Sequence, residues 1–423
     1  MNKPALATVF LVVMIDLLGF GIVLPLLPFY AKEFSASAVT IGLLYSVYSF
    51  MQLIFSPIWG SWSDRIGRRP IMLLSTFGAM IAYIIFGLAE SIGVLFFSRI
   101  VAGTMGGNIS TAQAYIADVT DSENRARGMG LIGAAFGIGF VIGPVTATGL
   151  IHPAFHQMVA DIGFTQFAAW MEANRFALPG FFAAFLSFCS FLMVLFKLPE
   201  TVDTEAPKED VYRRPSVFSP RFWRMLQEQK TTSARGYLIP LIIGFFLLSF
   251  GESNLYSAFP LFAETELGLN AEDVGLQFFY IGIIAVVIQG FLIKPLTNIF
   301  AEEKIFLVGN FLMVTGLGLI PFANSMWTLA LFLGIMAVGK SLNTPTITSL
   351  ISKEAGEHNV GAVMGASQGL SGLGRMIGPT WGGALFAIYF GLPFFATALI
   401  VASTIWIATG LIKKESARLS AEA

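Results

Sequence analysis

The chain has 423 residues, of which 55% are hydrophobic and only 12% are charged. A soluble globule of this length needs more polar surface than that composition supplies, so the sequence predicts an all-α membrane protein that crosses the bilayer many times. The formal net charge of -1 points to no class of partner, nucleic acid included, and the single Cys189 excludes an intrachain disulfide framework.

Apolar runs of about 20 residues, the length that crosses roughly 30 Å of acyl chain, recur along the chain. The abundance of phenylalanine suits helices better than barrel strands, which alternate with period two. The first run is too long for a signal-peptide core and contains Asp16, so we expect it to be retained. We predict twelve spans, at residues 6–30, 40–60, 71–89, 92–116, 129–150, 177–198, 237–262, 274–296, 304–322, 326–349, 361–383 and 388–412.

The distribution of Lys and Arg predicts the orientation of these spans. If the chain starts inside, the basic residues between spans fall on the cytoplasmic side, apart from Lys32 and Arg175. This asymmetry is typical of membrane proteins. We therefore expect a multi-pass protein of the cell (inner) membrane with both termini in the cytoplasm.

A charged hinge, Gly60–Pro70, separates the second and third predicted spans. Its arginines could act only as topogenic charges. An acid contributes little to topology, however, so Asp64 indicates a further role. The glycines permit close approach and a tight turn, and a proline suits the first turn of the next helix. The residues we single out as a gate are Gly60, Asp64, Arg65, Gly67, Arg68 and Arg69.

Three more charged residues, Asp118, Arg125 and Arg127, follow the fourth span on the same predicted side. Together with the hinge they could form a network that locks the inner mouth of a cavity. Because exposed ion pairs contribute only about 0–1 kcal/mol each, such a gate needs several of them or a partly buried site.

The two halves of the chain are a repeat. Residues 116–144 align without a gap with residues 351–379, at an offset of 235. This predicts two pseudo-symmetric six-helix bundles, residues 1–198 and 237–423, joined by a cytoplasmic linker at 199–236. Two such bundles leave a cavity near the bilayer midplane that rocking exposes to either side in turn.

Small residues in the fifth and eleventh spans let helices approach closely, and we expect them at the interface between the halves. Prolines after them bend each helix. The residues of this pattern are Gly139, Gly143 and Pro144, with their repeats Gly374, Gly378 and Pro379.

Five charged residues lie inside predicted spans: Asp16, Arg99, Glu252, Lys340 and Arg375. A charge at the bilayer centre costs at least about 2.5–3.5 kcal/mol on insertion scales, so such residues tend to face a cavity and a partner. We predict that Asp16 and Glu252 exchange protons with the two sides and that Arg99 tunes them. The alternative is that Asp16 and Arg99 form a static pair between the first and fourth spans.

Polar and aromatic side chains within the spans are candidates for contact with a solute. Phenylalanine and methionine add adaptable apolar surface, which favours bulky amphipathic molecules, and the mixed charges also suit a zwitterion. The candidates are Tyr45, Gln52, Asn108, Gln113, Tyr115, Asn254, Tyr256, Gln289, Lys340, Asn343, Gln368 and Arg375.

Residues 152–175, between the fifth and sixth spans, carry apolar side chains at roughly helical intervals. They could form an amphipathic helix on the outer leaflet. A tolerated loop insertion is the alternative. His152 and His156 are spaced for one helix face, but we expect no metal site there.

The hinge 60–70 is similar to the loop signature of the major facilitator superfamily. Nearly the whole chain resembles its twelve-span drug:proton antiporter family, which includes the tetracycline efflux proteins. The supporting residues are Asp16 with Pro25, Arg99–Gly103, Asp118 with Arg125 and Arg127, Gly139–Pro144, and Leu198–Thr201. The resemblance implies the major facilitator fold, cavity-forming roles for the charged spans, and contact between Asp64 and the amino end of the eleventh span.

We therefore expect a secondary active transporter, a proton-coupled antiporter that exports small amphipathic organic molecules by rocker-switch alternating access. The proton is the coupling ion, and we expect a monomer in the lipid bilayer with no other cofactor. Solute uptake by symport or facilitated diffusion is the alternative, as is a protein that senses or handles lipid. We do not expect an enzyme, because the sequence shows no nucleophile–base or metal constellation at useful spacing.

Overall fold

A computed structural model describes the chain apart from residues 1–2, 121, 203–236, 356–359 and 423. It also leaves the side chains of residues 3, 122–127, 130, 360–362 and 414–422 outside the description. Every secondary-structure element among the described residues is a helix.

The first half of the chain forms helices that follow the predicted spans closely, with one additional pair. They are α1 (Lys3–Glu33), α2 (Ala38–Ile66), α3 (Arg68–Gly87), α4 (Ile92–Met105), the 3-10 turn η1 (Gly106–Asn108), α5 (Ile109–Val119), α6 (Ser122–Ile151), the short α7 (Pro153–Asp161) and α8 (Thr165–Ala173), and α9 (Ala177–Lys197).

The second half repeats this series of long helices. They are α11 (Leu238–Leu267), α12 (Ala271–Val287), the π-helical η3 (Ile288–Leu292), α13 (Ile293–Ile299), α14 (Glu302–Leu319), the 3-10 turn η4 (Ile320–Phe322), α15 (Met326–Ala355), α16 (Val360–Ile388) and α17 (Leu392–Glu422).

Eleven spans in the described part of the chain are long and apolar enough to cross a membrane, and α16, with 29 residues, is a further long helix. The predicted all-helical membrane fold is confirmed. One boundary was wrong, because the hinge is not a loop: α2 continues to Ile66 and α3 begins at Arg68. At 1.5 Å per residue, the 29 residues of α2 are longer than roughly 30 Å of hydrocarbon, so its last charged turn can remain helical outside the bilayer.

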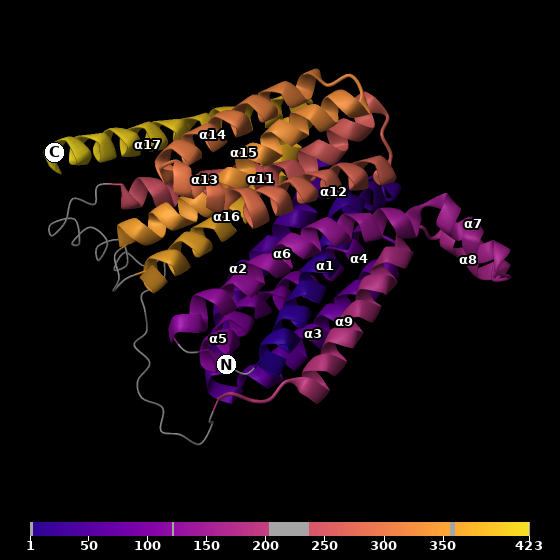
Figure 1. Ribbon diagram of the computed structural model, residues 1–423. Helices are drawn as coiled ribbons and strands as arrows, with labels where there is room; N and C mark the ends of the chain where they lie inside the picture. The colour runs from indigo at the N-terminus through magenta and orange to yellow at the C-terminus, as the bar shows by residue number, and fades with distance from the viewer. Residues whose placement is uncertain (1–2, 121, 203–236, 356–359, 423) are drawn as a thin grey trace. The chain divides into compact units, whose positions relative to one another are not determined.

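The contacts divide the chain into two units. Unit 1 is Met1–Ala206 with Phe259–Ile283, and unit 2 is Pro207–Ala258 with Ile284–Ala423. In unit 1, α1 packs against α6 and α9, and α3 packs against α4 and α9 (Figure 1). In unit 2, α14 packs against α15 and α17. The linker predicted at 199–236 falls almost entirely outside the described residues, so that boundary stays a prediction.

The glycines of the fifth and eleventh spans lie inside the units. A Cβ on Gly143 of α6 would be 2.6 Å from the backbone of Gly21 on α1, and a Cβ on Gly374 of α16 would be 2.8 Å from the Phe250 amide nitrogen on α11. The neighbours that a Cβ would meet at Gly143 and Gly374 therefore lie within one unit, and a place at the interface between the halves stays a prediction for these glycines. They let α1 and α6, and likewise α11 and α16, pack backbone to backbone within one unit.

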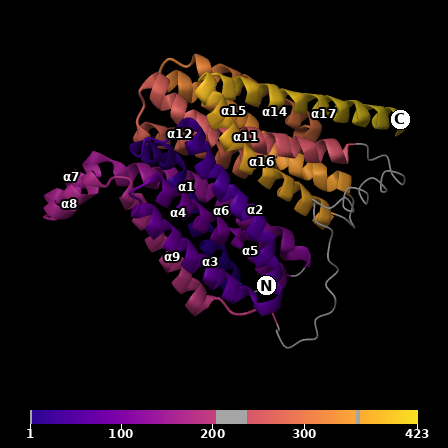
Figure 2. The same ribbon diagram turned by 180° about the vertical axis from the view of Figure 1, so that it is seen from behind.

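The insertion after α6 is two short helices, not one. The chain turns at Gly163, whose φ of 101° lies in the left-handed region, so that α8 folds back on α7. The pair projects sideways from the ends of α6 and α9 (Figure 2). His156 is buried, with its Nε2 2.9 Å from the Leu150 carbonyl, and His152 caps α7 by accepting the Ala154 amide.

The backbone contact at Gly143 predicts that a side chain at this position lowers the stability of the protein. We expect Gly143→Val to destabilise the protein by about 1–3 kcal/mol, because α1 must move to admit the new atoms. Gly149→Val is the matched control on the same helix, where nothing lies within 4 Å of the added Cβ. The thermal unfolding midpoint of purified protein in detergent measures both; equal midpoints for the two variants contradict the packing described here.

Candidate functional site

A cluster of charged side chains surrounds the junction between α2 and α3. Arg68 is only 8% exposed, and its guanidinium binds Asp64 through Nη1 and Asp118 of α5 through Nε, the latter at 3.0 Å. Nη1 also donates to Ser63 Oγ at 2.7 Å. One arginine therefore joins the end of α2, the start of α3 and the end of α5. We call Asp64, Arg68, Asp118 and Glu200 the junction cluster.

Glu200 completes this cluster from the segment after α9. Its Oε1 accepts the backbone N–H of Arg68 at 2.8 Å, and its Oε2 accepts that of Arg69 at 3.1 Å. The first amides of a helix lack partners within the helix and carry partial positive charge, so a carboxylate there stabilises α3. Gly67 leaves room for it, since a Cβ at that position would overlap the Glu200 carboxylate.

The other predicted gate residues surround this cluster. Arg69 donates through Nη2 to the Leu195 carbonyl at 2.7 Å, whereas Arg65 is exposed. Gly60 faces Ser110 of α5. Arg125 and Arg127 lie on α6, but their side chains fall outside the described residues.

Asp16 of α1 meets Asn108 of η1, and not Arg99. Asn108 Nδ2 donates to Asp16 Oδ2 at 2.6 Å, while the buried Oδ1 has no hydrogen-bond partner among the described residues. This carboxylate has no ion-pair partner in the part of the chain that the structure describes. The alternative interpretation, a static pair between Asp16 and Arg99, is therefore not found in that part.

Arg99 of α4 is 3% exposed and is held in a mainly aromatic environment. Its guanidinium carbon lies 5.0 Å from the ring centroid of Phe86, and its Nε donates to Ser98 Oγ at 3.3 Å. Tyr83, Tyr48 and Tyr45 also interact with it electrostatically. A cation can be stabilised over an aromatic face without an acid beside it.

Unit 2 contains a second group of charges, which are partly buried. Lys340 Nζ of α15 lies 2.6 Å from Glu252 Oε1 of α11, which also accepts the Tyr256 hydroxyl at 3.0 Å. Arg375 of α16 interacts electrostatically with Glu252 and donates to Ser371 Oγ at 2.8 Å. These four residues are the unit 2 charge cluster: Glu252, Tyr256, Lys340 and Arg375.

The remaining solute candidates separate into two groups. Tyr45, Gln52, Asn254 and Asn343 hydrogen-bond to neighbouring helices: Tyr45 donates to the Leu24 carbonyl at 2.6 Å, and Asn254 to the Pro393 carbonyl at 2.9 Å. Tyr115 is likewise buried and donates to the Pro199 carbonyl at 3.0 Å. Gln113, Gln289 and Gln368 are exposed. A role in binding a solute stays a prediction for all of them.

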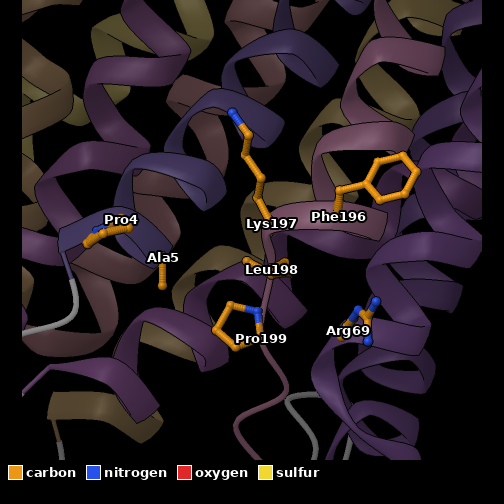
Figure 3. Close-up of a pocket in the computed structure, with 7 residues that line it drawn as sticks. All are labelled: Pro4, Ala5, Arg69, Phe196, Lys197, Leu198 and Pro199. Atoms are coloured by element: carbon orange, nitrogen blue, oxygen red, sulfur yellow. The ribbon is translucent and has the colours of Figure 1, made fainter.

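An open cavity of about 430 Å³ lies beside the junction cluster, at the ends of α1, α3 and α9. Pro4 and Ala5 of α1 lie on one side of it and Phe196 and Arg69 on the other, with Lys197, Leu198 and Pro199 between (Figure 3). Of these residues the sequence singled out only Arg69 as a gate residue.

Sequence reasoning missed Glu200 as a site residue. The segment Leu198–Thr201 was noted only as typical of a family, because nothing local shows that its acid reaches a helix start 132 residues earlier. The available signal was the positive φ expected at Gly67, just before a helix whose first amides need an acceptor.

Comparison with known families identifies the fold of the whole chain. The model of the Major Facilitator Superfamily matches residues 9–239 and 241–423. This match covers both halves of the repeat and the junction cluster.

Individual relatives and solved structures extend the comparison. The class E tetracycline resistance protein of Escherichia coli is 28% identical over 419 residues, which are 95% of each chain. Multidrug resistance protein 2 of Bacillus subtilis is 28% identical over 404 residues, 93% of this chain and 92% of that one. The crystal structure of the human organic anion transporter MFSD10 (TETRAN) has a TM-score of 0.67 at 23% identity, covering 96% of this chain and 99% of that one.

The bonds of Glu200 predict the effect of removing its carboxylate. We expect Glu200→Ala to destabilise the protein by about 0.5–2 kcal/mol, the usual range for loss of a helix cap, because the Arg68 and Arg69 amides lose their acceptor. Glu90→Ala is the control, since Glu90 is exposed and no hydrogen bond from it is present in the described chain. Thermal unfolding in detergent compares them, and unchanged stability in Glu200→Ala refutes the assignment.

Proposed function

Because the chain belongs to the Major Facilitator Superfamily, we propose that this multi-pass membrane transporter is a proton-coupled antiporter that exports small amphipathic organic molecules. Relatives of the same length are resistance proteins for tetracycline and for multiple drugs, at about 28% identity. The observation that carries the proposal is the position of two acids inside membrane spans, Asp16 in unit 1 and Glu252 in unit 2.

Asp16 is suited to carry a proton. One of its oxygens accepts from Asn108, and the other is buried without a hydrogen bond in the described chain. A carboxylate without a counter-ion in a low-dielectric span is less costly when it carries a proton. It can therefore be loaded from one side and discharged to the other as its surroundings change, and substrate then favours the discharged form.

Glu252 is suited to exchange partners. It already has a cation, Lys340, at 2.6 Å and a hydroxyl donor, Tyr256. An anionic group on an incoming solute can compete for Lys340 and for Arg375, and the freed Glu252 can then take up a proton. Substrate and proton binding are thereby linked at the unit 2 charge cluster. This favours a zwitterionic or weakly anionic solute with an apolar body.

The junction cluster is our proposed inner gate. Its ion pairs join α2, α3 and α5 within unit 1, and in this proposal they hold the unit 1 side of the inner mouth in its closed form until the rocker switch opens it. In this proposal both termini and the junction cluster face the cytoplasm of an inner-membrane protein. The transporter works as a monomer of two six-helix bundles, and the proton is its coupling ion.

The two acids generate the first functional test. We expect Asp16→Asn and Glu252→Gln each to abolish proton movement driven by tetracycline in proteoliposomes, because neither amide can carry the proton. Binding of the drug to the purified variants should persist. Asp161→Asn, an exposed neutralisation in α7, is the control and should transport normally. Unaltered coupling in both Asp16→Asn and Glu252→Gln refutes the proposed proton sites.

The gate has a separate test. Asp64→Asn removes one charge beside Arg68, and a loss of about 1 kcal/mol changes the ratio of closed to open states roughly fivefold. We expect slower net export in proteoliposomes with little change in thermal stability. Arg65→Gln, at an exposed position on the last turn of the same helix, is the control. Normal transport by Asp64→Asn is the result that would reject the gate.

A further inference from the structure

The α7–α8 hairpin is held at the edge of the membrane by both of its ends. Only His152 separates α6 from α7, and only residues 174–176 separate α8 from α9. Both flanking helices are candidate membrane spans. Each hairpin helix has nine residues, or about 14 Å at 1.5 Å per residue, so even with the linking residues extended the turn at Gly163 lies within about 25–30 Å of the ends of the spans.

Large apolar side chains cover the outside of this hairpin, and we call them the hairpin apolar face. The exposed fraction is greatest at the turn, with 66% for Ile162 and 62% for Phe164. The inside of the hairpin is already filled, because His156, Ala168 and Met171 are buried there. The members of the face are Met158, Ile162, Phe164, Phe167 and Trp170.

This face continues onto the membrane span that follows it. Phe167 stacks on Trp170 with centroids 5.8 Å apart, and Trp170 contacts Phe181 of α9 at 6.0 Å. Farther along α9, Phe185 and Phe188 are also exposed, one and two turns from Phe181. Exposed aromatic rings on a candidate membrane span therefore lead to the ring contacts that join this span to the hairpin.

The geometry distinguishes between two placements. If the hairpin stood upright in water, the two most exposed apolar residues, Ile162 and Phe164, would be farthest from the membrane. The hairpin leaves α6 and α9 sideways in both views of the molecule (Figure 1 and Figure 2). Between Pro153 and Ala173 only Asp161 and Glu172 are charged, so few charges oppose contact with lipid.

We propose that the hairpin apolar face lies in the phospholipid surface at the membrane side where α6 ends and α9 begins, and that the bilayer is its binding partner. Aromatic side chains favour that boundary between headgroups and acyl chains, and an amphipathic helix binds there by burying its apolar side. The hairpin thereby anchors unit 1 in one leaflet, at a point beside the helices of unit 1. The anchor does not depend on which solute the protein carries or on proton coupling.

Spin labels at single cysteines test this placement, since the chain has only one cysteine to remove. In a Cys189→Ser background, labels at Phe164→Cys and Ile162→Cys report on the hairpin apolar face. Labels at Asp161→Cys and Glu172→Cys, the two charged positions of the hairpin, are the matched controls. Each full-length labelled protein is placed, one chain per disc, in nanodiscs of phosphatidylethanolamine and phosphatidylglycerol. Relaxation by oxygen, which concentrates in lipid, is compared with relaxation by a water-soluble nickel chelate.

We expect the oxygen-to-nickel ratio at residues 162 and 164 to exceed that at residues 161 and 172 several-fold. Equally low ratios at all four positions would place the hairpin in water and overturn the proposal. A second outcome would also overturn the proposal: labels that are shielded from the nickel chelate only when two chains share a disc, with a measurable dipolar distance between the labels of the two chains. That result would show that a second copy of the chain is the partner. The two apolar positions report independently, so failure of one variant to fold leaves the other to decide.

Discussion

The bilayer requires every backbone polar group and every charge within it to find a partner inside the protein. Long helices satisfy the hydrogen bonds of the backbone. Each charged side chain within the spans is then stabilised by the groups that pack beside it. Lys340 has Glu252, whereas Arg99 lies over the ring of Phe86. Asp16 has one amide donor and one oxygen without a partner in the described chain, so it is the intramembrane acid whose charge is least compensated. The requirement that shapes the fold thus leaves least compensated the acid that we propose as a proton carrier.

The two halves keep one packing rule and diverge in their polar chemistry. Gly143 on α6 meets the backbone of α1, and Gly374 on α16 meets that of α11, so the close helix pair is preserved in both units. Asn108 and Asn343 occupy the same place in the repeat, at the offset of 235. Asn108 donates to Asp16, whereas Asn343 donates to Asn310, at 3.1 Å. A duplicated scaffold therefore carries an acid–amide pair in one unit and an acid–lysine pair in the other.

Hydropathy and residue spacing predicted the helices and the repeat, because both depend on local composition. The second span was predicted to end at residue 60 because so dense a block of charges cannot lie in hydrocarbon, yet α2 remains helical to Ile66. The contacts of the site were harder to predict. Glu200 reaches Arg68, and Lys340 reaches Glu252, only once distant helices have packed. Spacing along the chain cannot specify such pairs: Arg99 was the partner considered for Asp16 in the alternative interpretation, whereas Asn108 donates to it in the fold. For the insertion the alternatives were one amphipathic helix or a loop, whereas the structure has two short helices divided at Gly163.

The contact between Gly67 and Glu200 also constrains how this sequence can change over time. Any side chain at position 67 must overcome both a φ of 106° and the carboxylate that occupies the space of its Cβ. Glu200, in turn, reaches two adjacent backbone amides only because that space is vacant. Positions 67 and 200 are 133 residues apart in the sequence, yet a substitution at one of them affects which residues are tolerated at the other. We therefore expect glycine at 67 and an acid at 200 to be inherited or lost as a pair.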